Sequence, residues 1–476
     1  MSTGLPDYLK MAKANPLANR APWYKNTAPT YAGIMLWFVF WLGATDVKNL
    51  GGVLSQGIWV PIVGLALAAL LCHAFYYVVL GMMGLKTGLP LYIVGTSTFG
   101  ATGGFIMPGF LMGLLQFGWL GVNIYFSSQA LANALPIKAE ILMVAWGVLA
   151  AFIGLKGIQY VAKVATYLPL IPIVTLIVLF FATVKGLGSF DAAKFVEFHK
   201  TMLGAAADKA PAAFTGFGLI VFLITYVVGF FATAGAAGVD FGTGARDERD
   251  VHMGGVVGIA AAIIFTAGLA SLIVAGAYGQ PEIANKVAAA AKEGKAVPVD
   301  AFNLIPFVLG SAAGKWIQFA LAVAAFPSAC FSSLIAANSF KTTLSKVNPF
   351  VSVGIGAAVS ILLAVFGVAA KLGSVFALIG ASFGPVCGAM AVDYILNGRK
   401  WAGPRQGFNP AGWLAWAFGF VVGIMPNLGL DLPLAPVWAM IVGAVIYFLA
   451  AKAGLQSPVM PMEGAKAEKE AELAAV

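Results

Sequence analysis

The sequence has little charge and few side chains that bind metals. Only 10% of its 476 residues are Asp, Glu, Lys or Arg, and it has three histidines and three cysteines. Cys72, Cys330 and Cys387 lie far apart, and no CxxC or HExxH motif occurs. The stretch 84–88 has a lysine between glycines but lacks the glycine spacing of a phosphate-binding loop. We therefore expect neither an enzyme nor an ATP-driven pump, and no cofactor.

What the chain has instead is apolar sequence, at 60% of its residues, which indicates an all-α polytopic membrane protein. A helix needs about 20 apolar residues to cross a bilayer. On this criterion we predict about twelve helices, at 31–52, 57–82, 103–128, 139–157, 163–185, 213–239, 253–278, 311–340, 350–370, 373–396, 411–429 and 433–452.

The distribution of positive charge predicts the orientation in the cell (inner) membrane. An even number of helices places both termini on one side. The short connections on that side carry ten lysines and arginines, whereas the opposite short turns carry almost none and only the longer connections at 186–212 and 279–310 hold several lysines, which indicates the cytoplasm. These cations are Lys86, Lys156, Lys163, Arg246, Arg249, Lys341, Lys346, Arg399, Lys400 and Arg405. Topology thus explains the net charge of +9 better than a nucleic-acid partner does. The lipid bilayer is the expected surrounding, and we expect the chain to function as a monomer.

We expect one membrane domain at 31–453, between a cytoplasmic segment at 1–30 and a cytoplasmic tail at 454–476. Two glycine-rich stretches at 43–52 and 229–238 fall in its first and sixth helices and predict breaks there. Broken helices in corresponding places favour two inverted repeats, at about 31–185 and 213–396, with two further helices at 411–453. The alternative is that these glycines only allow helices to pack closely.

Two aromatic segments could form a site for a flat heterocycle. Gln116 and Trp119 are three residues apart and share one helical face, where an amide could bind the edge of a ring and an indole its face. Phe230 and Phe231 on the sixth helix could supply an opposite wall. A lone glutamine in a membrane helix can equally hold two helices together, and aromatic pairs commonly face lipid or the core.

Oxygen ligands for a small cation are the second chemical signal. Ser332 and Ser333 follow Ala329 by three and four residues, so two hydroxyls and one carbonyl could share a helical face. Serines also bond to their own helix, which is the structural alternative. Asp46 and Lys48 in the first glycine-rich stretch could couple transport to protons, or could neutralise one another.

Several segments, in order and at similar spacing from the first helix to the twelfth, resemble the nucleobase:cation symporter-1 family, and within it the cytosine permeases. They are 81–89, 97–100, 116–119, 228–231, 384–388 with 392–394, and 408–410. The resemblance implies the five-plus-five inverted-repeat (LeuT-like) transporter fold, uptake of a nucleobase by alternating access, and coupling to sodium.

Site residues also follow from the resemblance. It implies that Trp119 and Phe231 sandwich the base, that Gln116 bonds its edge, and that Asn338, with Thr45 and Phe230 nearby, completes the substrate site. Sodium would lie between Ala329, Ser332 and Ser333 and the carbonyls of Phe40 and Gly43. The sequence departs from the family pattern at Asp46, Lys48 and Phe230. These departures leave the expected fold intact. They leave open whether the substrate is cytosine or another heterocycle, whether the coupling ion is sodium or a proton, and whether the protein is a passive facilitator.

Overall fold

The computed structural model describes residues 5–462 except 157, 158, 160–162, 164, 166 and 345, and this part of the chain is almost entirely helical. It contains ten helices that are long and apolar enough to cross a membrane. With the interrupted first helix and the shorter apolar helix α20 (Pro349–Val365), the described residues contain the twelve crossings expected from the sequence. The chain is therefore an integral, multi-pass membrane protein.

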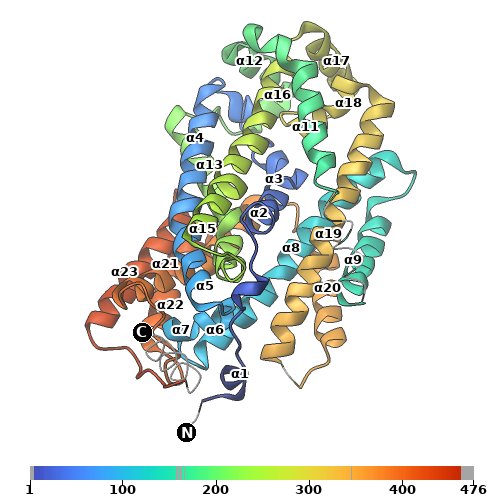
Figure 1. Ribbon diagram of the computed structural model, residues 1–476. Coiled ribbons are helices and arrows are strands. Elements are labelled where there is room, and N and C mark those ends of the chain that lie inside the picture. The colour runs from blue at the N-terminus through green and yellow to red at the C-terminus, as the bar shows by residue number, and fades with distance from the viewer. Residues whose placement is uncertain are drawn as a thin grey trace.

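The crossings follow one another along the chain in the order that the apolar runs predict (Figure 1). They are α2 and α3 (Thr27–Met35 and Phe38–Gly43), α4 and α5 (Trp59–Leu71 and Val79–Thr87), α8 (Leu111–Ala134), α9 (Ala139–Lys156), α11 (Leu170–Thr183), α13 (Gly216–Ala236), α15 and α16 (Glu248–Gly255 and Leu269–Tyr278), α19 (Ser311–Thr343), α20, α21 (Leu372–Leu396), α22 (Pro410–Ile424) and α23 (Ala435–Lys452). The start of the predicted fifth helix falls partly on residues outside those described.

The first helix is interrupted, but not where its glycines predicted. The interruption lies at Leu36 and Trp37, between α2 and α3, where Trp37 takes a non-helical conformation (φ −59°, ψ 124°). The stretch 43–52 instead begins at the end of α3 and continues into a loop. Gly51 and Gly52 there adopt positive φ angles of 74° and 54°, which suit glycine in a turn. The glycines therefore lie at the end of α3 and in the loop after it, and not at the interruption of the first helix.

The sixth helix also has an interruption, which is smaller than predicted. α13 continues through Gly229 and Gly235 and ends at Ala236, and the short α14 (Gly238–Gly242) follows after Ala237. A Cβ atom on Gly229 would lie 2.8 Å from the carbonyl oxygen of Phe376, and one on Gly235 would lie 2.9 Å from the Cβ of Tyr76. These two glycines therefore serve close helix packing, which was the alternative reading of the sequence.

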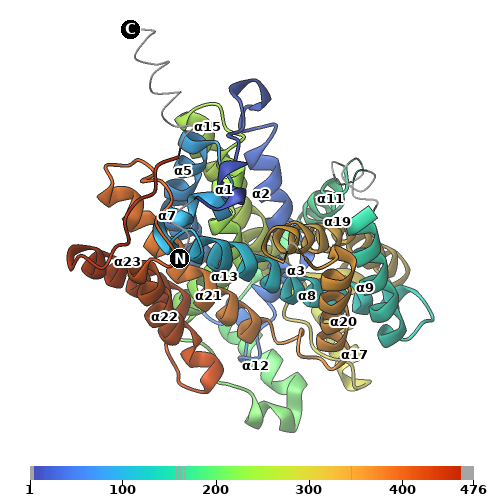
Figure 2. The same cartoon turned by 90° about the horizontal axis from the view of Figure 1, so that it is seen from below.

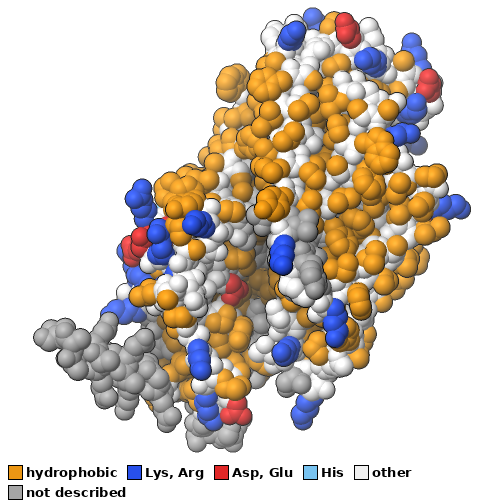
Figure 3. Space-filling view, turned by 45° about the vertical axis from the view of Figure 1, so that its right-hand side comes forward, with side chains coloured by type: hydrophobic (Ala, Val, Ile, Leu, Met, Phe, Trp, Pro, Cys, Tyr) orange, Lys and Arg blue, Asp and Glu red, His pale blue; other side chains and the backbone are white. Residues whose placement is uncertain are grey.

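The helices form one bundle with both ends of the described chain at the same end (Figure 1). Seen from that end, α8, α13 and α21 lie toward the middle, and α22 and α23 lie at the periphery (Figure 2). The N-terminal residues pack on the bundle, where the guanidinium of Arg20 donates to the carbonyl oxygens of Leu85 (2.9 Å) and Ala245 (3.3 Å). Apolar side chains cover the middle of the face drawn in Figure 3, and lysines and arginines gather toward the two ends, as expected for a protein in a bilayer.

The end opposite the termini is covered by three shorter helices, α12 (Ala192–Leu203), α17 (Pro281–Lys292) and α18 (Ala301–Leu309). Asp46 and Lys48, the proposed coupling residues, lie beyond α3 in the loop at this end, and both side chains are exposed. Neither lines the central cavity. Asp300, which caps α18, is buried, and burial together with the charge of Asp46 raises its pKa to about 7.

A histidine joins α12 to the loop that follows α3. The buried His199 accepts the backbone N–H of Gly51 at its Nδ1 atom (3.0 Å), and burial lowers the pKa of His199 from 6.5. When Nδ1 is protonated it becomes a donor, and it can no longer accept the N–H of Gly51. Because the folded pKa lies below the unfolded one, this contact is fully present above about pH 6.5 and is lost as the pH falls through the folded value.

We expect the Gly51 amide to exchange hydrogen faster at pH 5 than at pH 7 after correction for the intrinsic rate, as measured by mass spectrometry. The matched control is His199→Asn, whose side-chain oxygen can accept the same N–H but does not titrate. An equal pH response in the wild type and this variant would contradict the prediction.

Candidate substrate-binding site

A cavity of about 1870 Å³ lies between the first helix, α8, α13 and α19. Asp7, Lys13, Lys25 and Lys341 line its mouth, and these residues belong to the end of the bundle that carries the termini. Trp37, Gln116 and Trp119 line its inner part. The cavity thus connects one end of the bundle with the middle of the bilayer-crossing helices.

Three aromatic rings surround Trp119 at the inner part of the cavity. Its ring centroid lies 5.0 Å from that of Phe230 on α13, in an edge-to-face arrangement, and 5.3 Å from that of Phe376 on α21. Trp37 lies 6.1 Å away, at the break in the first helix. Edge-to-face and tilted pairs at these separations are favourable, so the rings hold one another in place around a site for a planar ligand.

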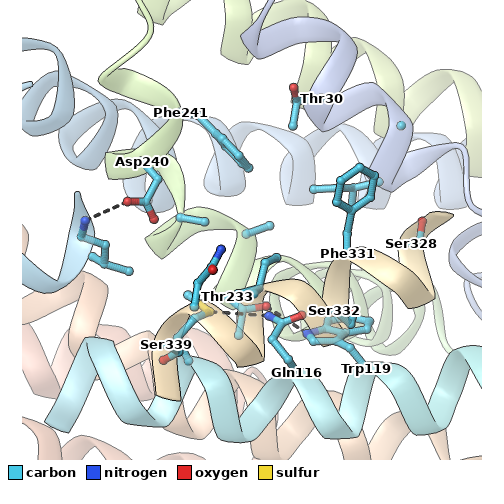
Figure 4. A pocket seen from close by; sticks show the side chains of 18 of the residues that line it. Thr30, Gln116, Trp119, Thr233, Asp240, Phe241, Ser328, Phe331, Ser332 and Ser339 are labelled. Atoms are coloured by element: carbon cyan, nitrogen blue, oxygen red, sulfur yellow. Dashed lines mark hydrogen bonds between the residues drawn. The ribbon is translucent and has the colours of Figure 1, made fainter. Parts of the chain in front are cut away.

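Polar groups occur beside these rings. The indole N–H of Trp119 donates to the hydroxyl of Thr233 (3.1 Å), which fixes the orientation of the indole (Figure 4). The amide nitrogen of Gln116 makes only a long contact with the sulfur of Met112 (3.6 Å), and sulfur is a weak acceptor. The Gln116 amide therefore keeps most of its hydrogen-bonding capacity for a ligand.

Trp37 is a site residue that the sequence analysis missed. Its side chain is 9% exposed and lines the cavity, and its indole N–H has no hydrogen-bond acceptor among the described residues. A buried donor without a partner is costly, so a ligand that presents an acceptor there would be favoured. Nothing in the sequence distinguished this tryptophan from those that face lipid, because its role depends on the break beside it.

The structure separates the predicted substrate residues into two groups. Gln116, Trp119, Phe230 and Asn338, all predicted substrate residues, line the cavity. Phe231 does not: it is fully buried, with its ring 5.6 Å from that of Tyr31. Successive residues of a helix point about 100° apart, so only one of the two phenylalanines can face the cavity, and it is Phe230.

Thr45 also lies away from the cavity. Its side chain is fully buried and its hydroxyl donates to the carbonyl oxygen of Trp41 on its own helix (2.9 Å). This local bond satisfies the hydroxyl, as is common for threonine near a helix end. Thr45 therefore has a structural role in this conformation.

The predicted cation ligands are likewise only partly brought together. Ser332 lines the cavity, and so do Gly33 and Leu36 at the break in the first helix. Ala329 and Ser333 are fully buried, and the hydroxyl of Ser333 donates to the carbonyl oxygen of Ala329 (3.3 Å). The Ser333 hydroxyl is thus bonded to the backbone of its own helix α19, and neither residue lines the cavity.

The first-helix partners, Phe40 and Gly43, are not placed for a cation in this structure. The carbonyl oxygen of Phe40 already accepts the N–H of Ala44 and the hydroxyl of Tyr226, both at 3.0 Å. Gly43 backs onto the side chains of Tyr226 and Leu372, where a Cβ atom would collide with both. Since the break lies seven residues before Gly43, the carbonyls it leaves without helical partners belong near Leu36.

Comparison with known proteins finds similar sequences and similar folds among transporters. The chain is 28% identical over 233 residues to the cytosine permeases of Escherichia coli strains K12 and O157:H7, a match that covers 48% of this chain and 49% of each permease. The matched region spans about half the length of these curated relatives. No family model matches the sequence.

Solved structures with the same fold cover almost the whole chain. The inward-facing structure of Mhp1 superposes with a TM-score of 0.66 at 15% identity, covering 94% of this chain and 97% of that one. A second Mhp1 structure, described as a nucleobase-cation-symport-1 family transporter in a closed conformation with bromovinylhydantoin bound, superposes with a TM-score of 0.60 at 15% identity. A sodium-coupled sialic acid symporter gives 0.57 at 14% identity.

The chain is thus similar in sequence to cytosine permeases over about half of its length, and it shares its fold with Mhp1, a nucleobase-cation-symport-1 family transporter. Its fold is the LeuT-like transporter fold that the sequence predicted, and none of these relatives is an enzyme.

Proposed function

We propose that this protein is a secondary active symporter that imports a nucleobase, cytosine before other bases, together with sodium by alternating access. The observation that carries the proposal is the aromatic inner end of the cavity, where Trp119, Phe230 and Trp37 surround space beside the unsatisfied amide of Gln116. Aromatic faces bind a flat base, and an amide binds its polar edge. The similarity to cytosine permeases supports this substrate class.

The cation would bind between the first helix and α19, beside the base. Carbonyl groups near Leu36 and the hydroxyl of Ser332 are neutral oxygen ligands, which suit a small hard cation. A cation bound to both helices would stabilise one arrangement of them, and sodium and base must then increase each other's affinity by the same factor. Positive charge near the termini supports a cytoplasmic location of both ends and of the cavity mouth.

The function is tested by uptake into proteoliposomes. Labelled cytosine should accumulate above its equilibrium level under an inward sodium gradient, with uracil, hydroxymethylpyrimidine, adenine, hypoxanthine, allantoin and hydantoin as competitors. Equilibration without accumulation under any ion gradient would mean a facilitator. Accumulation driven by a proton gradient alone would replace sodium with protons, and would direct attention to carboxylates such as Asp46.

Replacing Ser332 by alanine should weaken sodium dependence more than base preference. We expect the sodium concentration for half-maximal cytosine binding to rise about tenfold, because one ligand of the cation is lost, while affinity at saturating sodium falls by less than threefold. Ser352→Ala, on α20 outside the cavity, is the matched control. The same sodium titration in both variants would count against a cation at Ser332.

A further inference from the structure

A second polar position lies on the same cavity, toward its mouth. Asp240 projects from α14 beside Phe241, and Figure 4 shows both side chains apart from Trp119 and Gln116. Asp240 is seven residues beyond Thr233, which contacts Trp119. At 1.5 Å per helical residue this corresponds to about 10 Å, which is too far for one small base to touch both.

Asp240 is held in place by only one of its two oxygens. Oδ1 accepts the backbone N–H of Leu91, the first residue of α6 (Leu91–Val94), at 2.8 Å. No lysine, arginine or histidine nitrogen lies within 4.0 Å of its carboxylate in the described residues. The side chain is exposed to the cavity. A carboxylate accepts hydrogen bonds only, so Oδ2 offers acceptor sites to whatever enters.

Aromatic residues also line the cavity together with this carboxylate. Tyr8, Tyr92, Phe105 and Phe241 all line the same part of the cavity. The ring of Tyr8 lies 4.7 Å from that of Phe105 and 6.5 Å from that of Tyr92. Tyr92 directly follows Leu91, whose backbone N–H donates to Asp240, so Tyr92 adjoins the carboxylate along the chain. This position therefore resembles the inner site, because both combine aromatic rings with a side chain that can accept a hydrogen bond.

We propose that Asp240, with Phe241 and Tyr92, forms a second subsite on the release path, selective for heterocycles that carry an amino group. This inference rests on the proposed function and adds to it a second position and a preference. A carboxylate accepts from the exocyclic amino group of cytosine, as acidic residues do when they read that base. Uracil presents a carbonyl oxygen at the corresponding edge, and two acceptors repel one another.

Asp240→Asn is the decisive variant, because its side-chain oxygen can still accept the Leu91 N–H while the charge and the second acceptor are lost. The matched control is Asp7→Asn, the other carboxylate that lines the cavity, whose side chain is 87% exposed and pairs with Lys10. Transport is measured in vesicles of known orientation, from the face that carries the termini, with cytosine as substrate and uracil as inhibitor.

In Asp240→Asn we expect the half-saturating cytosine concentration at this face to rise about tenfold, since a hydrogen bond to a charged acceptor is lost. Inhibition by uracil should stay equal or improve, and affinity at the opposite face should stay within twofold. Asp7→Asn should match the wild type. An unchanged cytosine concentration in Asp240→Asn, or equal losses for cytosine and uracil, would overturn the subsite. Absence of saturable cytosine transport in the wild type would instead overturn the proposed function, and the subsite with it.

Discussion

Replacing Trp119 by alanine is expected to abolish measurable binding of the base. The indole packs against Phe230 and Phe376 and presents its remaining surface to the cavity, so its removal deletes a stacking face worth about 1–3 kcal/mol. It also leaves the Thr233 hydroxyl without its donor and the neighbouring rings without support. Together these losses predict a decrease in affinity of at least a hundredfold, measured by binding of labelled cytosine to the purified protein.

Two further variants separate stacking from general damage. Trp119→Phe keeps an aromatic face but not the N–H, and should retain most of the affinity. Trp316→Ala removes a tryptophan that is 63% exposed on α19 and should bind like the wild type. If Trp119→Ala bound cytosine as tightly as Trp316→Ala does, the site would lie elsewhere in the cavity.

Replacing Gly84 by alanine should strongly destabilise the bundle. Gly84 on α5 packs against α14, and a Cβ atom there would lie 1.9 Å from the carbonyl oxygen of Val239 and 3.1 Å from the Cα of Gly242. Both are backbone atoms, so no side chain can rotate to relieve the clash. Overpacking costs about 1–3 kcal/mol where side chains can adjust, and we expect the upper end or more here. The readout is the melting temperature and the monodisperse yield in detergent.

Gly354→Ala on α20 is the control, because nothing lies within 4 Å of the added carbon. Alanine favours helix over glycine by about 1 kcal/mol, so this variant should melt at or above the wild-type temperature. Equal melting temperatures for the two alanine variants would show that α5 and α14 do not pack as described. A selective loss of transport in Gly84→Ala without a stability change would also contradict the prediction.

The crossing helices and the chemistry of the inner site could be predicted from local sequence. Apolar runs of bilayer length are visible without a structure, and the three-residue spacing of Gln116 and Trp119 is enough to put both on one face. Phe230 was foreseen as well, but with Phe231 beside it. Which of two adjacent rings faces the cavity depends on the rotation of α13, and that rotation is set by the helices packed around it.

The position of the break in the first helix could not be predicted from the local sequence. Gly43, Gly51 and Gly52 suggested a break because glycine tolerates unusual backbone angles. The actual break at Leu36 and Trp37 contains neither glycine nor proline. Trp37 lies among Trp119 and Phe230, which belong to segments about 80 and 190 residues away in the chain. Contacts over such distances leave no pattern in the residues next to the break.

The sequence by itself therefore determined that this is a helical, multi-pass membrane protein, with Gln116 and Trp119 on one helical face. These properties depend on hydrophobicity and on spacing within single helices. Only the tertiary structure decided that the first helix is interrupted at Leu36 and Trp37, that Phe230 instead of Phe231 faces the cavity, and that Asp240 lines it. Each of these depends on how helices distant in sequence are rotated against one another.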